Sequence, residues 1–395
     1  MKQNKRILIL SASVGAGHTR AAEAIESTIK ERFPFIKTLI VDSYRYASAL
    51  WGRVAADGYI QMVKRWPKLY GYLYEAGRKE SKFLAFKNWI SQIAAQNFRP
   101  LIAEFNPSVI VCTHAFPCGI ASVLKDEYNI PVVGVVTDYV VHPYWIYNNI
   151  DLYSVATMEM QMMLESYNIS RSRIKVTGIP VDARFNIHEP KDELRKRHSL
   201  ELSLPTVLLM GGGLGLGPME KIFRALRRIS YPAQAIVVVG TNKTLQRRME
   251  AYAKRVNITG AFSRLLKCNF LRNIRVYNYV DFIHELMKAS DFVITKPGGL
   301  TSTEAIVTET PLLLMKPLPG QEERNSQWLV QKKVAIPVNK EKHIPRVLDD
   351  LLINPKKIER MKFKARQIKK PQAALHVTQA IISLLNIYED AVSMA

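Results

Sequence analysis

The sequence predicts an α/β protein of two lobes, each a parallel β-sheet with helices on both faces. Three observations support this prediction. Short apolar strands alternate with helical patterns, each half of the chain opens with a strand, a glycine-rich loop and a helix, and a polar, proline-bearing stretch at 179–191 separates the halves. The 395 residues suffice for two domains, and 48% of them are hydrophobic. We therefore expect lobes over 1–185 and 186–371.

In the first lobe, a strand at 6–10 leads through a glycine loop into a helix at 19–32. Further strands are expected at 38–41, 108–112 and 131–136. Residues 44–100 interrupt this rhythm as a long, mostly helical insertion.

In the second lobe, a strand at 206–210 precedes the glycine loop 211–217 and a helix. Four more strands are expected at 235–239, 275–277, 292–295 and 312–315. The last helix, within 372–395, is amphipathic, and we expect it to pack back on the first lobe.

The formal net charge of +22 calls for an anionic partner. Residues 44–100 hold 10 Lys and Arg against 3 Asp and Glu, together with 12 aromatic residues. Such interleaving is typical of helices at a membrane surface and is also compatible with single-stranded nucleic acid. Trp51 and Trp66 are the candidate membrane contacts.

No apolar run approaches the ~20 residues that span a bilayer. The three cysteines are scattered along the chain, so we expect a reducing, cytoplasmic location.

The strongest motif lies in residues 291–327. A buried strand ends at Thr295, and Gly298 and Gly299 let the chain turn into a helix whose amides, from Leu300 through Thr301 to Thr303, form an anion site. Glu304 is placed to accept hydrogen bonds from ribose hydroxyls; the alternative is a capping pattern begun by Thr301. Gln321 and Glu322 follow the next strand, with groups that recognise sugar hydroxyls. Because ligands bind at such strand ends, we favour a binding site.

The chain resembles the monogalactosyldiacylglycerol synthase and processive diacylglycerol glucosyltransferase family, which is related to the peptidoglycan enzyme that adds N-acetylglucosamine to lipid I. The 291–327 block carries the resemblance, and matching motifs run through nearly the whole chain. These are Ser11, Ser13, Gly15, Gly17 and His18; Thr137, Asp138, Tyr139, His142 and Trp145; residues 178–181; Gly211, Gly212, Gly213 and Gly215; and residues 279–282.

The resemblance implies the GT-B architecture, in which two Rossmann-like lobes face a cleft. By this resemblance Glu304 binds the donor's ribose, and Gln321 and Glu322 bind its sugar. Phe282 and Ile283 frame the uracil through backbone contacts, while loop 211–217 takes the pyrophosphate. Gly15 and Gly17 lie on the acceptor side. The family inverts the sugar's configuration without an essential metal, and this sequence has no Asp-x-Asp pair that would hold a divalent cation beside a pyrophosphate.

His18 is the candidate base. It starts the first helix, where the N-terminus lowers the pKa of a histidine, and an inverting transfer needs a base for the acceptor hydroxyl. The alternative is that His18 only bonds the loop backbone or the donor phosphate. Asp138 is the rival base, an orienter of His18 or a helix cap. His142 and Trp145 either shape the acceptor pocket or make ordinary aromatic contacts, and Asp42 is interpreted as a cap.

Other nucleotide chemistries fit less well. The first loop lacks the full G-x-G-x-x-G of nicotinamide enzymes, and loop 211–217 lacks the Lys-Ser/Thr pair of a P-loop. We therefore predict a hexosyltransferase that moves a sugar from a UDP-sugar to diacylglycerol, or to its own glycosylated product, at the cytoplasmic side of the membrane. No cofactor and no nucleic acid partner is expected. The alternatives are a transferase with a polyprenyl-linked or soluble acceptor, and a nucleic-acid-binding protein.

Overall fold

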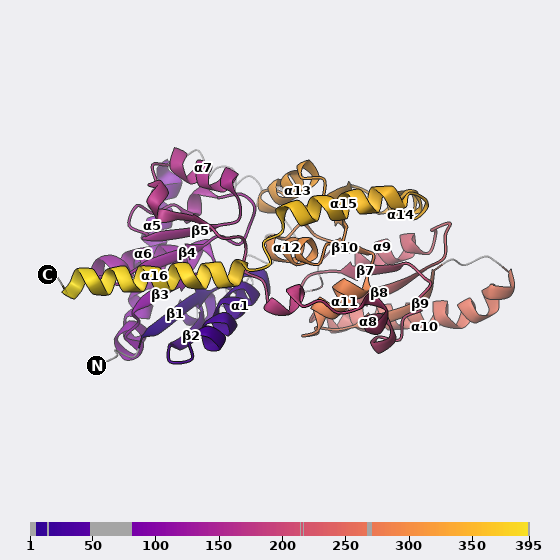
Figure 1. The fold of residues 1–395 in the computed structure, drawn as a ribbon, viewed down its shortest axis with the longest axis horizontal. Coiled ribbons are helices and arrows are strands. Elements are labelled where there is room, and N and C mark those ends of the chain that lie inside the picture. The colour runs from indigo at the N-terminus through magenta and orange to yellow at the C-terminus, as the bar shows by residue number, and fades with distance from the viewer. Residues whose placement is uncertain are drawn as a thin grey trace. The chain divides into compact units, whose positions relative to one another are not determined.

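The computed structural model describes residues 5–13, 16–47, 81–213, 215, 217–266 and 271–393. Gly15, Trp51 and Trp66, with most of the predicted basic and aromatic insertion, lie outside these residues. The chain forms two compact units (Figure 1). Unit 1 comprises Met1–Ala183, Leu318–Arg324 and Lys370–Ala395, and unit 2 comprises Arg184–Pro317 and Asn325–Lys369. Contacts thus group residues 318–324 with unit 1, whereas their position in the sequence suggested the second lobe.

Unit 1 is built on a parallel sheet of six strands in the order β2-β1-β3-β4-β5-β6. The strands are β1 (Arg6–Ser11), β2 (Lys37–Asp42), β3 (Val109–Cys112), β4 (Val132–Val135), β5 (Leu152–Val155) and β6 (Ile174–Val176). The helices are α1 (Ala16–Arg32), α2 (Ser43–Ala47), α5 (Ser81–Phe105), α6 (Ala115–Tyr128), α7 (Met158–Ser166) and α16 (Ala373–Ser393), with 3₁₀ turns η1 (Pro143–Trp145) and η2 (Arg171–Arg173).

The core of unit 1 explains why its strands appear in the sequence as unbroken apolar runs. Ile7 and Ile9 of β1 pack against Ile25 of α1 on one face of the sheet, in the same cluster as Val377 and Ile381 of α16. Helix α16 lies beside α1 and across the strands (yellow in Figure 1). Because helices cover the sheet, alternation of apolar and polar residues is not needed.

Unit 2 contains a second parallel sheet in the order β12-β11-β10-β7-β8-β9. Its strands are β7 (Thr206–Met210), β8 (Ala233–Val238), β9 (Leu271–Tyr277), β10 (Phe292–Thr295), β11 (Leu312–Met315) and β12 (Ala335–Val338). Its helices are α8 (Lys191–Arg197), α9 (Met219–Leu226), α10 (Lys243–Leu266), α11 (Ile283–Ala289), α12 (Gly299–Val307), α14 (Ile344–Ile353) and α15 (Pro355–Ile368), with 3₁₀ turns η3 (Ala183–Asn186) and η4 (Glu341–His343). Helix α13 (Gln321–Gln331) begins within the 318–324 segment.

Three strands of the structure are not predicted by the sequence patterns. Strand β6 has only three residues, and β12 contains Pro337, which is tolerated because β12 lies at the sheet edge. Strand β5 buries a polar residue, Ser154, whose hydroxyl bonds that of Thr177 at 2.6 Å. All of the strands that the sequence predicts are present, and their ends differ from the predicted ends by up to four residues. Within the described residues, no helix combines the length and apolar character needed to cross a membrane.

Candidate active site

In unit 1, the predicted acceptor-side residues gather where the parallel strands end. The loops after β1, β3 and β4 open at the same edge of the sheet, so His18, Thr113 and Thr137 come together although up to 119 residues separate them. Asp42, at the end of β2, accepts a hydrogen bond from the Tyr44 amide and therefore caps α2, which confirms the cap interpretation.

His18 lies in the first turn of α1, and its Nδ1 atom contacts two oxygens. The Thr113 carbonyl oxygen is 3.0 Å away and the Thr137 hydroxyl oxygen is 2.7 Å away. A carbonyl oxygen can only accept, so Nδ1 carries the hydrogen. In the neutral ring Nε2 is then the nitrogen that can take up a proton.

The electrostatics favour that neutral ring. Burial lowers the pKa of His18 below its ordinary value, although the Asp138 carboxylate and the Thr113 hydrogen bond act in the opposite direction. His114 lies edge-on to His18, with ring centroids 4.6 Å apart, and its Nδ1 caps α6 by accepting from the Phe116 amide. Burial, reinforced by the His18 ring, holds the pKa of His114 well below its ordinary value. His18 can therefore act as a base near neutral pH.

Asp138 follows β4 and is 5% exposed. It accepts a hydrogen bond from the Gln321 side chain, within the same unit. Its electrostatic effect on the His18 ring makes Asp138 part of the His18 environment. Its role, as base or as orienter, stays a prediction.

His142 and Trp145 have structural contacts. The His142 side chain accepts from the Tyr144 amide and caps the 3₁₀ turn that begins at Pro143. Trp145 is 4% exposed, so its indole packs in the interior of unit 1. This burial favours the packing alternative for Trp145. Gly17 occupies the first turn of α1, next to His18.

In unit 2, the glycine loop after β7 is folded tightly onto itself. Gly212 and Gly215 have φ angles of 70° and 59°, in the left-handed region that glycine adopts readily. A Cβ on Gly215 would lie 2.1 Å from the Val239 carbonyl oxygen, and one on Gly211 would lie 2.3 Å from the Met219 sulfur. The glycines are therefore required by the fold of the loop as well as by any ligand.

Two residues that sequence reasoning missed hold this loop. The Thr241 amide and hydroxyl both donate to the Gly213 carbonyl, at 2.9 and 3.2 Å. Gly240, with φ 62°, would bring a Cβ within 2.3 Å of the same oxygen. The available signal was a glycine two residues after the end of β8.

Helix α12 begins directly after β10. Its N-cap is Gly298, and Ser302 already donates to the Gly298 carbonyl at 3.1 Å. The amides that precede this first intrahelical bond are those of Gly299, Leu300 and Thr301, so the expectation that the anion site extends to Thr303 was wrong. The capping alternative for Glu304 is wrong too, because Thr301 lies inside the helix and is not its N-cap.

The Glu304 carboxylate lies in the second turn of α12 and is 2% exposed. Burying a carboxylate is costly unless donors surround it, and paired ribose hydroxyls are donors of that kind.

Lys296, the residue after β10, was also missed by sequence reasoning. A Cβ on Gly212 would meet its Cε at 3.8 Å, so this cation lies against the glycine loop.

Phe282 and Ile283 begin α11, on the chain after β9. Phe282 is the N-cap, and its carbonyl accepts from the Glu285 amide at 3.0 Å. Ile283 is 2% exposed, so its side chain is interior and its backbone amide remains the group for recognition. Because all six strands are parallel, this helix start, the glycine loop and the α12 start share one edge of the sheet.

Gln321 and Glu322 are grouped with unit 1. Glu322 accepts from the Leu318 amide at 2.9 Å and so closes its own loop, while Gln321 contacts Asp138. Their predicted contact with the donor sugar stays a prediction.

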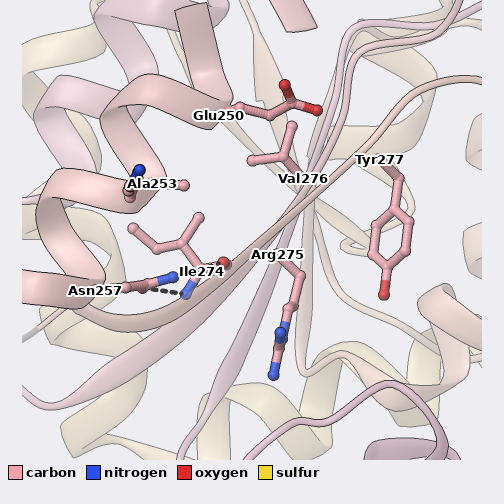
Figure 2. Close-up of a pocket in the computed structure, with 8 residues that line it drawn as sticks. Glu250, Ala253, Asn257, Ile274, Arg275, Val276 and Tyr277 are labelled. Carbon is pink, nitrogen blue, oxygen red and sulfur yellow. Dashed lines mark hydrogen bonds between the residues drawn. The ribbon is translucent and has the colours of Figure 1, made fainter. Parts of the chain in front are cut away.

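A hollow of 680 Å³ in unit 2 lies between α10 and the edge strand β9 (Figure 2). Glu250 and Asn257 of α10 and Arg275 and Tyr277 of β9 are among its lining residues, and none of the predicted donor residues is. A smaller hollow of 440 Å³ includes Gly240 and Thr241, next to the glycine loop. The donor-site assignment therefore depends on the glycine loop and the helix starts, not on the larger hollow.

Comparison with protein families gives two matches that follow the two halves of the chain. Residues 18–181 match monogalactosyldiacylglycerol (MGDG) synthase, and residues 219–377 match the glycosyltransferase family 28 C-terminal domain. These matches identify the chain as a glycosyltransferase. The predicted family resemblance is confirmed, and the glycine loop residues 211–217 lie just before the family 28 domain.

Curated relatives cover nearly the whole chain. A processive diacylglycerol beta-glucosyltransferase of Bacillus pumilus is 28% identical over 388 residues, 97% of this chain and 96% of that protein. One of Bacillus licheniformis is 28% identical over 92% of this chain and 90% of its own.

Solved structures agree on the fold. MurG of Acinetobacter baumannii has a TM-score of 0.59 at 16% identity, covering 96% of this chain and 99% of its own. MnaA of S. aureus, solved with UDP, has a TM-score of 0.60 at 14% identity, covering 97% of each chain. The predicted GT-B fold is confirmed.

Proposed function

We propose that this glycosyltransferase moves a hexose from a UDP-sugar to diacylglycerol, with inversion at the anomeric carbon. The observation that carries the proposal is the edge of the unit 2 sheet, where a glycine loop and a helix start come with a buried carboxylate, Glu304. These are groups for a pyrophosphate and a ribose. The names of the curated relatives support a diacylglycerol acceptor and glucose as the transferred sugar.

Each part of the UDP moiety of the donor has a matching group in unit 2. The α12 amides from Gly299 to Thr301 and the glycine loop supply N–H donors for the phosphates, and Lys296 supplies a positive charge beside the loop. Glu304 accepts from the ribose hydroxyls, and the start of α11 presents backbone groups to the uracil. As the sugar leaves, negative charge grows on the pyrophosphate, and these donors stabilise it.

The transfer is a single displacement. His18 Nε2 takes the proton of the acceptor hydroxyl while the hydroxyl oxygen attacks the anomeric carbon from the face opposite the leaving group. The new glycosidic C–O bond forms as the bond to the UDP oxygen breaks, UDP departs with that electron pair, and the configuration inverts. The Thr113 carbonyl and the Thr137 hydroxyl hold Nδ1–H and so fix the tautomer in which the lone pair of the neutral ring lies on Nε2.

A lipid acceptor requires the enzyme to work at a bilayer surface, and we propose peripheral attachment at the cytoplasmic face. The net charge of +22 supports attraction to anionic lipids. We propose that residues 44–100, including Trp51 and Trp66, contribute to this attachment. Successive transfers to the product are part of the proposal because the curated relatives are described as processive.

The test is a product assay with purified full-length protein. UDP release and labelled product are followed with UDP-glucose, UDP-galactose or UDP-N-acetylglucosamine, each offered with diacylglycerol vesicles, a polyprenyl-linked sugar, a soluble sugar or no acceptor. We expect a glucosylated diacylglycerol, followed by a product with two sugars, only with UDP-glucose and diacylglycerol. Transfer to the polyprenyl-linked or a soluble acceptor instead would overturn the proposed acceptor.

A further inference from the structure

Helix α8 ends at a cluster of three rings that includes Phe282. His198, the residue after α8, stacks on Phe282 with centroids 5.3 Å apart and planes inclined by 19°. Tyr277 meets both rings edge-on, at 5.8 Å from Phe282 and 6.3 Å from His198. Offset-stacked and edge-on arrangements are the favourable ones for ring pairs. The Phe282 ring is therefore supported by two neighbours, one of them a histidine that no motif had singled out.

The His198 ring is itself held in place. Its Nε2 lies 2.9 Å from Glu285 Oε2, and since a carboxylate accepts, Nε2–H donates. The other oxygen of Glu285 pairs with Arg197 at 2.9 Å. Glu285 lies in the first turn of α11, where the helix dipole favours a negative charge. Burial opposes ionisation, but the bonds from Arg197 and His198 lower the pKa of Glu285 below its ordinary value.

The opposite end of α11 is bound to α8 as well. The buried Arg195 donates from Nε to the Ala289 carbonyl at 3.1 Å, and from Nη2 to Asp291 at 2.7 Å. Asp291 also accepts from the Thr206 amide at the start of β7. Helix α8 is thus attached to both ends of α11 and to the sheet, so the His198 ring has little freedom to move away from Phe282.

We propose that His198 is a positioning residue for donor recognition, which holds Phe282 and the first turn of α11 in the orientation that frames the uracil. The inference depends on the proposed function, in which the backbone at Phe282 and Ile283 contacts the base. His198 stacks on one face of Phe282 and is tied to the helix that this residue caps. It therefore sets the direction of the backbone groups of α11 without contacting the reacting atoms.

The role predicts a particular kinetic signature. His198→Ala raises the KM for the UDP-sugar and the Kd for UDP by about threefold to tenfold, the range expected for loss of one ring pair. The kcat stays within twofold of wild type, because the base and the leaving-group contacts are untouched. Calorimetric titration with UDP and initial-rate kinetics with diacylglycerol vesicles measure these values.

Two conservative variants separate the ring from its hydrogen bond. His198→Phe keeps the stack and is expected to bind UDP within twofold of wild type. His198→Gln keeps a donor for Glu285 but loses the ring, and is expected to resemble His198→Ala. His343→Ala, at an exposed histidine before α14, is the matched control and should change nothing. Thermal unfolding of each variant checks that folding is intact.

Glu304→Ala distinguishes failure of this inference from failure of the donor site, because Glu304 is the proposed ribose ligand and is not a member of the ring cluster. If Glu304→Ala binds UDP as tightly as wild type, the proposed donor site is wrong. If Glu304→Ala weakens UDP binding but His198→Ala does not, the donor site stands and the positioning role is overturned. A wild-type affinity for His198→Gln, or a fall in kcat at constant KM for His198→Ala, overturns it too.

Discussion

The two units begin alike, with a strand, a glycine-bearing loop and a helix, yet they present different chemistry. In unit 1, α1 starts at Ala16, and a side chain, His18, meets the ends of β3 and β4. In unit 2, the loop packs on Gly240 and Thr241 and consists largely of glycine, so its polar groups are those of the backbone. In the proposed mechanism, one region controls a proton through a ring nitrogen, and the other recognises an anion through amides. The shared topology determines where a site lies, and the residues at the loop determine what it does.

The sharpest test of this contrast is His18→Ala. Removal of a general base costs ~10²–10⁴ in rate, so kcat should fall by that factor while UDP binding is retained. Single-turnover kinetics and calorimetric titration with UDP measure the two quantities. A variant that keeps most of its kcat would assign the base role to Asp138 or to a water molecule.

Glu304→Ala should give the opposite result in unit 2. The loss of hydrogen bonds to a charged acceptor is worth ~1.5–3 kcal/mol, so the KM for the UDP-sugar rises by about one to two orders of magnitude. The kcat at saturating donor should change much less. Unchanged affinity for UDP in calorimetry would remove Glu304 from the site.

The glycine loop offers a comparison within unit 2. Gly215→Ala forces a side chain into a left-handed conformation against Val239, so we expect a loss of ~1–3 kcal/mol of unfolding free energy. Gly298→Ala adds a methyl group where nothing lies within 4 Å and φ is −72°, so stability should hold. Denaturant unfolding measures both. Equal destabilisation would mean that the loop does not need its left-handed glycine.

Thr137→Val tests how closely the His18 ring is held. It removes the hydroxyl 2.7 Å from Nδ1 but keeps the shape of the side chain. One lost hydrogen bond of ~0.5–1.5 kcal/mol corresponds to about a threefold to tenfold fall in kcat, with an unchanged KM for the UDP-sugar. Thr137→Ser, which restores the hydroxyl, should recover most of the rate. Failure of this rescue would show that packing and not the hydrogen bond is responsible.

We expect the kcat to depend least on pH near neutrality. His18 is active when neutral, and burial places its pKa below the ordinary 6.5. The kcat should therefore be nearly flat from pH 7 to 8 and fall on acidification, with a midpoint below 6.5. A midpoint above 6.5 in stopped assays with vesicle-borne acceptor would indicate that Asp138 outweighs burial.

Local patterns in the sequence were enough to predict many of the strands and the place of the nucleotide site. Apolar runs closed by glycine loops located β1, β7 and β10, and the block from Asp291 to Glu304 indicated a nucleotide site, because a strand, a turn and a helix start are all set by neighbouring residues. Family resemblance added the glycosyltransferase activity, and the family matches confirm that activity.

Tertiary structure alone decided which distant residues support the site. His18 meets Thr113 and Thr137 across 95 and 119 residues, and His198 meets Glu285 across 87. Thr241 bonds to a glycine 28 residues earlier. No periodicity or short motif encodes such pairs, because they depend on the order in which parallel strands assemble. That order, β2-β1-β3-β4 in one sheet and β10-β7-β8-β9 in the other, brings the strand ends and their side chains together.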